Sequence, residues 1–165
     1  MAESFSFDVV SDFDRQELVN TLDQVKREIS HRYDLKDTAT SVDLDKENIF
    51  IITNSELTLN AVNDIIRQKA IKRNLSLKIF DYGDIEMVSG NRIKQTILLK
   101  QGIKQEIAKK ISKNIRDQIK KINVSIIGET LRVSSKSKID LQLVIMLITE
   151  LEESLNIPLK ANNFR

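Results

Sequence analysis

The order of hydrophobic patterns along this chain constrains its fold more than any single motif, because one order occurs twice. Apolar residues that alternate with polar ones predict strands, and apolar residues three or four positions apart predict amphipathic helices. In the first half, strand, helix, strand, strand, helix and strand are predicted at 4–10, about 14–31, 41–44, 49–53, 55–73 and 77–80. In the second half the same order returns at 93–99, about 103–122, 124–127, 131–134, 140–155 and 159–162. Two βαββαβ units in tandem are therefore expected.

A βαββαβ order is typical of the ferredoxin-like fold, an α+β arrangement in which helices cover one face of an antiparallel sheet. The polar stretch 82–91, which includes Gly83 and Gly90, is the candidate linker between the two units. We therefore predict a first unit over residues 1–90 and a second over 91–165. The two halves show no clear sequence identity, so the repeat lies in the order of the elements.

Net charge differs between the two halves, although the whole chain of 165 residues carries only +2. Residues 1–90 contain 11 Lys and Arg against 17 Asp and Glu, a net charge of −6. Residues 91–165 contain 15 against 7, a net charge of +8. An acidic first unit and a basic second unit are expected, and the positive field of the second would attract anionic ligands.

Composition excludes several other classes of protein. With 41% hydrophobic and 30% charged residues the chain has an ordinary globular balance, and it contains no cysteine for disulfides or thiolate chemistry. The amino terminus lacks the basic and then apolar pattern of a secretory signal, so a cytoplasmic location is the default expectation. The most apolar run, 143–148, is far shorter than the roughly 20 residues that span a bilayer, and no membrane interaction is expected.

The helix predicted at 140–155 is apolar nearly all round, from Leu141 to Leu151. A helix of this kind must be covered on two sides. Its own sheet is one cover, and the companion unit or a second copy of the chain is the other. Ile145 and Leu147 point in different directions, and both are expected to be buried.

Residues that could catalyse a reaction or hold a metal are few. The single histidine, His31, lies among polar residues at the predicted end of a helix, where it is expected to be exposed. The isolated glycines form neither a phosphate-binding loop nor a dinucleotide fingerprint. The pair Asp43 and Asp45 and the pair Asp81 and Asp84 lack the spacing of a calcium loop, so they are expected in turns. We therefore predict a protein that is not an enzyme, with no catalytic residue, no metal and no cofactor.

A row of basic residues lies along the helix predicted at 103–122, opposite its isoleucines. On 100° per residue the row consists of Lys109, Lys113, Arg116 and Lys120. Such a row is either a solvated helix face or an electrostatic guide for an anion.

The loop before the last helix is the sharper candidate site. Ser137 and Asp140 form a capping box, and Lys136 and Lys138 stand on either side of the serine. The loop is either a phosphate site at a helix N-terminus or a cap with two solvated lysines.

Aromatic residues that could stack on bases are scarce, and the RNA-recognition consensus is absent. Phe5 and Phe7 are expected in the core. Phe50 differs from them, because Ile49 and Ile51 beside it should take the inward face of the strand. If Phe50 lies on an open sheet face, a base could stack there for about 1–3 kcal/mol.

Several short runs carry a family resemblance. They are KQGI from Lys100, KKI from Lys120, Leu131-Arg132-Val133, SKSKIDLQ from Ser135, the terminal Asn163-Phe164-Arg165, and, in the first half, Ser6–Ser11, Arg32-Tyr33-Asp34 and Lys72-Arg73. Together they resemble the YajQ family of small bacterial nucleotide-binding proteins. Family members usually have a glycine before Lys136, an arginine at 138 and an aspartate at 139, where this chain has Ser135, Lys138 and Ile139.

The resemblance implies binding of nucleotides rather than a reaction, with cyclic di-GMP or RNA proposed as ligands. It also implies that the units exchange their first strands, so that 4–10 complete the second sheet and 93–99 the first.

We therefore hypothesise a nucleotide-binding protein, with a cyclic di-GMP sensor as one form of it. Its phosphate-binding residues would be Arg132, Lys136, Ser137, Lys138 and Arg165, of which the arginines could form bidentate contacts. The alternatives are a protein that binds single-stranded RNA or tRNA, and an adapter that binds protein partners through its charged halves without a nucleotide. The sequence leaves the oligomeric state open.

Overall fold

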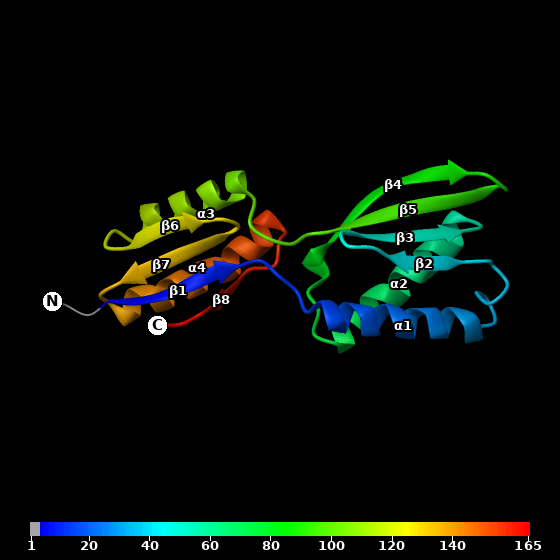
Figure 1. Ribbon diagram of the computed structural model, residues 1–165, viewed down its shortest axis with the longest axis horizontal. Helices are drawn as coiled ribbons and strands as arrows, with labels where there is room; N and C mark the ends of the chain where they lie inside the picture. The colour runs from blue at the N-terminus through cyan, green and yellow to red at the C-terminus, as the bar shows by residue number, and fades with distance from the viewer. Residues whose placement is uncertain (1–3) are drawn as a thin grey trace. The chain divides into compact units, whose positions relative to one another are not determined.

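The computed structural model describes residues 4–165, which form four α-helices and two four-stranded antiparallel sheets (Figure 1). The chain divides into two compact units, each with its own hydrophobic core. One comprises residues 13–100, and the other comprises residues 101–165 together with 1–12. We call them the 13–100 unit and the 101–165 unit. The predicted α+β fold with two ferredoxin-like units is confirmed.

The 13–100 unit contains α1 (Arg15–His31), β2 (Ser41–Leu44), β3 (Asn48–Thr53), α2 (Glu56–Lys72), a short 3-10 helix η1 (Leu77–Ile79), β4 (Phe80–Val88) and β5 (Arg92–Leu99). Its sheet has the order β2-β3-β5-β4. Asp14 caps α1, because its Oδ1 accepts a hydrogen bond from the Glu17 amide at 3.2 Å, as the capping box predicts. Alternate residues of β3 and β5 are buried in the same core as residues of α1 and α2.

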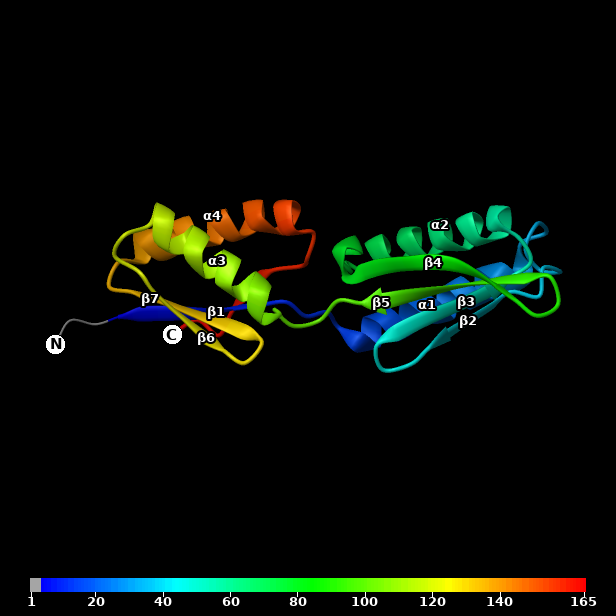
Figure 2. The ribbon, with the colours of Figure 1, turned by 90° about the horizontal axis from the view of Figure 1, so that it is seen from above.

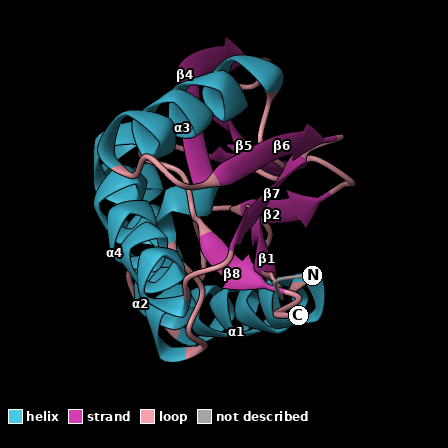
Figure 3. Cartoon of the chain, turned by 90° about the vertical axis from the view of Figure 1, so that its left-hand side faces the viewer, coloured by secondary structure: helices cyan, strands magenta, loops and turns pink. Residues whose placement is uncertain are grey.

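The 101–165 unit contains β1 (Phe5–Val10), α3 (Gln105–Gln118), β6 (Asn123–Ile127), β7 (Thr130–Ser135), α4 (Lys138–Leu155) and β8 (Lys160–Asn162). Its sheet has the order β6-β7-β1-β8. Figures 2 and 3 show α3 and α4 on one side of these strands. None of the helices formed by the described residues of this unit lies on the other face of the sheet.

The first strand of each half lies in the sheet of the other half. β1 pairs with β7 and β8, and β5 pairs with β3 and β4, all antiparallel. Both are central strands, so neither half of the chain holds a complete sheet by itself. The exchange also redistributes charge: the 13–100 unit has 14 Lys and Arg against 14 Asp and Glu, and the rest of the chain has 12 against 10. The folded units therefore carry net charges of 0 and +2, and the contrast between the sequence halves disappears.

The stretch 82–91, expected to be a linker, belongs instead to the β4–β5 hairpin. β4 continues to Val88, and 89–91 turn the chain into β5. Because β4 is an edge strand whose residues from Asp81 to Met87 are all exposed, its sequence lacks the alternation of a half-buried strand. Two smaller expectations are also wrong. Residues 77–79 form a 3-10 turn rather than a strand, and α3 ends at Gln118 rather than near 122.

The helix α4 is covered on one side by its own unit. Leu147 is buried and Ile145 is half-buried against the same core. In the part of the chain that the structure describes, the opposite side of α4 is not covered, and Ile139, Leu143 and Met146 are exposed there. None of the helices formed by residues 4–165 is long and apolar enough to cross a bilayer.

Candidate functional site

Serine hydroxyls fix the turn between β7 and α4. Ser137 is the N-cap of α4, and its Oγ accepts a hydrogen bond from the Asp140 amide at 3.3 Å, as the capping box predicts. The Ser137 amide donates to the Oγ of Ser135 at 3.1 Å, and that hydroxyl donates to the carbonyl of Lys121 at 3.3 Å. Ser135, at the position where family members usually have glycine, thus ties the turn to the segment between α3 and β6.

A surface groove of about 470 Å³ opens beside this turn. It is lined by Lys120, Lys121, Ile122, Asn123, Ser135, Lys136, Ser137 and Asp140. Its three lysines outnumber its one carboxylate, and the N-terminus of α4 adds positive potential and first-turn amides without an intrahelical acceptor. The groove therefore suits a small anion, phosphate in particular.

The predicted row of four basic residues is divided in the structure. Lys109 and Lys113 are exposed on α3. Arg116 donates to the carbonyl of Val124 at 2.9 Å and so helps to hold α3 against β6. Lys120 lies beyond the end of α3 and lines the groove at Ser137. Of the four, Lys120 is the one that the fold brings to the predicted phosphate site.

Lys138 does not line the groove with Lys136. Its Nζ lies 4.7 Å from the centroid of the Phe5 ring, a favourable cation–π geometry. Lys136 and Lys138 therefore lie in different surroundings. Lys138 contributes its backbone amide to the helix N-terminus, but its side chain does not line the groove.

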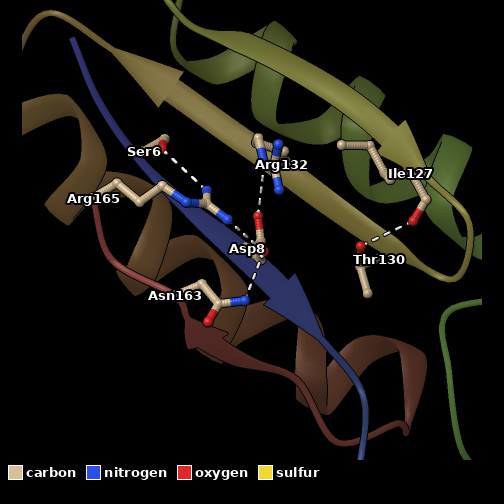
Figure 4. A network of polar contacts seen from close by, with 7 residues as sticks. All are labelled: Ser6, Asp8, Ile127, Thr130, Arg132, Asn163 and Arg165. Atoms are coloured by element: carbon tan, nitrogen blue, oxygen red, sulfur yellow. Dashed lines mark hydrogen bonds and ion pairs between the residues drawn. The ribbon is translucent and has the colours of Figure 1, made fainter.

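The two predicted arginines meet at Asp8, as Figure 4 shows. Asp8 lies directly opposite Arg132 in the β1–β7 pair, and its Oδ1 accepts from Arg132 Nε at 3.0 Å. Its Oδ2 accepts from Asn163 Nδ2 at 3.0 Å and from Arg165 Nη2 at 3.4 Å. Arg165 Nη1 also lies 3.4 Å from the hydroxyl of Ser6. The carboxylate thus gathers groups from β1, β7 and the C-terminal segment.

A bulge in the C-terminal segment makes this meeting possible. β8 pairs Asn162 with Asp8, and then Arg165 exchanges two backbone hydrogen bonds with Ser6, at 2.9 and 3.1 Å. Two residues, Asn163 and Phe164, therefore stand opposite the single residue Phe7, and Asn163 has the positive φ of 54° that such bulges use. Because of the extra residue, the Phe164 ring lies against Phe7, with 5.5 Å between the ring centroids. Arg165 then lies on the same face of the sheet as Asp8.

Asp8 is charged and nearly enclosed, while both arginines keep access to solvent. Hydrogen bonds from Asn163 and Arg132 hold the pKa of the Asp8 carboxyl below its usual value of 3.8, against the desolvation that raises it. The side chain of Asp8 is 9% exposed, and those of Arg132 and Arg165 are 44% and 46% exposed. Guanidinium N–H groups that Asp8 does not use can therefore reach a ligand on the helix-free face of this sheet.

The five predicted binding residues thus fall into two groups, one at the groove and one at Asp8. Sequence reasoning missed Lys121 and Asn123 at the groove, and Asp8 and Asn163 at the arginines. A signal for Lys121 was present in the KKI run, which follows the helix directly. Asp8 could have been found as the charged residue on the polar side of β1, which it shares with Ser6.

Phe50 lies on the helix-free face of the other sheet. It is half-buried, between the buried Ile49 and Ile51, and Thr96 lies opposite it on β5. The Nζ of Lys94 stands 4.9 Å from the centroid of its ring. An aromatic ring and an ammonium group are therefore adjacent on this face.

Groups that could hold a metal ion do not gather in the described part of the chain, where no three His, Asp or Glu side chains come together. His31 is exposed at the end of α1, and its Nδ1 lies 3.0 Å from the hydroxyl of Ser30.

Comparison with known proteins identifies the family. The model of the family described as "nucleotide-binding protein YajQ-like" matches residues 5–165. A Prochlorococcus marinus protein (strain MIT 9301) is 92% identical, one from strain SARG is 62% identical, and one from Synechococcus sp. (strain CC9605) is 55% identical, each over the full length of both chains. All three are named nucleotide-binding proteins. The chain therefore belongs to the YajQ-like family of nucleotide-binding proteins.

Proposed function

We propose that this protein binds a nucleotide without transforming it, and that a phosphate of the nucleotide occupies the groove at the N-terminus of α4. The observation that carries the proposal is the meeting of Lys120, Lys121 and Lys136 with the cap residue Ser137 at one groove. The relatives' shared name points to the same class of ligand.

The groove offers a phosphate several donors at once. The Ser137 hydroxyl accepts from the Asp140 amide, so its own proton is free for a phosphate oxygen. Three exposed ammonium groups attract the anion, and although each exposed ion pair contributes only about 0.2–1 kcal/mol, the three act on one point. The helix N-terminus adds oriented backbone amides, whose position is already set by the serine turn.

Asp140 gives the site a means of choosing among nucleotides. Its carboxylate lines the same groove and would repel a phosphate placed directly against it. It can instead accept hydrogen bonds from a base, and guanine is the base whose N1–H and N2 amino donors lie side by side and can both be accepted by one carboxylate. A guanine nucleotide, cyclic di-GMP included, is therefore the first ligand to test.

Arg132 and Arg165, which Asp8 holds in place, would supply a second contact to the nucleotide. Arg132 and Arg165 are aligned by the carboxylate, and their outer N–H groups can bind a second phosphate or the O6 and N7 edge of guanine in a bidentate manner. A ligand with two phosphates, such as a cyclic dinucleotide, is large enough to use more than one cationic group. Ligands with a single phosphate would depend on the groove alone.

The test compares two double variants by calorimetry at two salt concentrations. The ligands are GMP, GTP, cyclic di-GMP and a short single-stranded RNA. For whichever nucleotide binds the parent protein, Lys120→Ala with Lys136→Ala should raise the dissociation constant at least about tenfold, or about 1.4 kcal/mol. Lys109→Ala with Lys113→Ala removes the same charge from an exposed helix face of the same unit, so it should chiefly reduce the salt dependence. Equal losses in the two variants, or no binding of any nucleotide, would overturn the proposal.

Binding of single-stranded RNA or tRNA is the second candidate, and Phe50 favours it. An exposed base could stack on the helix-free side of this ring while Lys94 contacts the neighbouring phosphate. Phe50→Ala should then lower the affinity for the short RNA and leave the affinities for GTP and cyclic di-GMP unchanged. The adapter hypothesis depended on oppositely charged halves, and the folded units offer no such contrast.

A further inference from the structure

A stripe of apolar side chains on α4 faces solvent, opposite the residues that fill the core. Ile139, Leu143 and Met146 are 74%, 46% and 65% exposed. At 100° per residue these three and Glu150 fall within about 60° of one another around the helix. The core side of the helix is formed by Leu141, Val144, Ile148 and Leu151. We call the first three residues the α4 stripe.

The α4 stripe has a positive end and a negative end. Lys136 stands just before α4, three positions from Ile139, and Glu150 lies four positions after Met146. Both side chains are exposed. Among the ion pairs formed within residues 4–165, none involves either of them.

We propose that the α4 stripe binds the α4 stripe of a second copy of this chain, with the two helices antiparallel about a two-fold axis near Leu143. In this arrangement Leu143 meets Leu143, and Ile139 meets Met146. Lys136 of each copy faces Glu150 of the other. The Ile139–Met146 and Lys136–Glu150 contacts are thus each made twice and the Leu143 contact lies on the axis, as an isologous interface requires.

The charge pattern of the α4 stripe favours a second copy of this chain as its partner. Along the helix the order is basic, three apolar residues, then acidic, so an antiparallel copy places its acidic end against the basic end of the first. A parallel pair would place lysine against lysine and glutamate against glutamate, which is unfavourable. Exposed apolar side chains in a continuous row are also a usual mark of a protein interface. One helix face buries less than the roughly 1,600 Å² of a standard interface, so the association is weak.

Sedimentation velocity over protein concentrations from about 10 μM to about 1 mM, the range of weak association, tests the proposal. The parent protein should change from monomer to dimer within this range. Leu143→Lys should raise the dimer dissociation constant at least about tenfold, because the axis places the two new charges against each other. Leu57→Lys is the matched control, since Leu57 is 82% exposed on α2, outside the stripe, and this variant should dimerise like the parent.

A charge exchange tests the antiparallel arrangement itself. Lys136→Glu and Glu150→Lys should each weaken the dimer about two- to tenfold, because each change breaks two exposed ion pairs. The double variant restores both pairs and should return to within about twofold of the parent.

A parent protein that stays monomeric throughout, or a Leu143→Lys variant that dimerises normally, would overturn the proposal. A double variant as weak as the single ones would overturn the antiparallel pairing. Because Leu143 does not line the groove, titrating its lysine variant with nucleotide separates failure of the dimer from failure of the groove.

Discussion

Replacing Asp8 with alanine is expected to destabilise the 101–165 unit by about 2–3 kcal/mol. The carboxylate accepts one hydrogen bond from a charged donor, Arg132, and one from the neutral Asn163, both at 3.0 Å. A charge-assisted bond contributes about 1.5–3 kcal/mol and a neutral one about 1, and we use the low end because Arg132 is half exposed to solvent. The longer contact from Arg165 at 3.4 Å adds little.

The measurement can separate this unit from the other. The protein has no tryptophan, and both of its tyrosines, Tyr33 and Tyr82, lie in the 13–100 unit. In urea, tyrosine fluorescence therefore reports the 13–100 unit and far-ultraviolet circular dichroism reports both. Asp8→Ala should lower the urea midpoint of the dichroism change. In a thermal melt, the Tm of a unit of this size should fall by roughly 8–24 °C, at about 4–8 °C per kcal/mol. Asp43→Ala, an exposed carboxylate on β2, is the control and should change stability by less than about 0.5 kcal/mol.

The pH dependence of this loss follows from the direction of the pKa shift. The pKa of Asp8 is lowered in the folded state, so its stabilising effect is complete above the usual carboxyl pKa of 3.8 and is lost as pH falls through the folded value. The difference between the parent and Asp8→Asn should stay constant between about pH 5 and 8 and shrink below about pH 4. A difference that grows on acidification, or an Asp8→Ala protein as stable as Asp43→Ala, would refute the reasoning.

Three further predictions follow from the packing. A fragment of residues 13–100 holds all four strands of its sheet and should melt cooperatively as a monomer. A fragment of residues 1–90 lacks the central strand β5 and should not melt cooperatively, so a cooperative melt of this fragment would exclude the strand exchange. Leu147→Ala should cost about 2–5 kcal/mol by urea denaturation, and the half-buried Ile145→Ala clearly less, so equal losses would contradict the one-sided burial of α4. Gly83→Ala should cost about 1–3 kcal/mol, because its Cβ would lie 2.7 Å from a backbone carbonyl oxygen of β5; an unchanged melting temperature would show that the hairpin yields freely.

Local features of the candidate site were predictable from the sequence, and its assembly was not. The Ser137 cap and the Asp14 cap involve residues three positions apart, so the chain itself brings their atoms together. The carbonyl of Lys121 accepts a hydrogen bond from Ser135 across a hairpin, and this brings Lys121 to the Ser137 turn. Asn163 donates a hydrogen bond to Asp8 from the other end of the chain. No short-range pattern encodes these approaches, because the pairing of strands decides them.

The same distinction explains why β4 was missed and why the second cover of α4 was not identified. Alternation predicts a strand when one face is buried, and β4 is an edge strand exposed from Asp81 to Met87, so its residues show no alternation. The apolar composition of α4 predicts burial on two sides, but composition cannot say which neighbour provides the second side. The family resemblance correctly implied the strand exchange, which periodicity alone could not.

The sequence by itself determined the order of the elements, the caps of the helices, the apolar side of α3 and the family. These properties depend on residues within a few positions of one another, or on runs compared directly with relatives. Tertiary structure decided that β1 and β5 change places, that the units carry net charges of 0 and +2, and that Arg132 and Arg165 share Asp8 while Lys120 and Lys136 share a groove. The physical reason is that a side chain's neighbours are set by which strands exchange hydrogen bonds. Those bonds join residues 40–50 positions apart in the β3–β5 pair and more than a hundred apart in the β1–β7 pair.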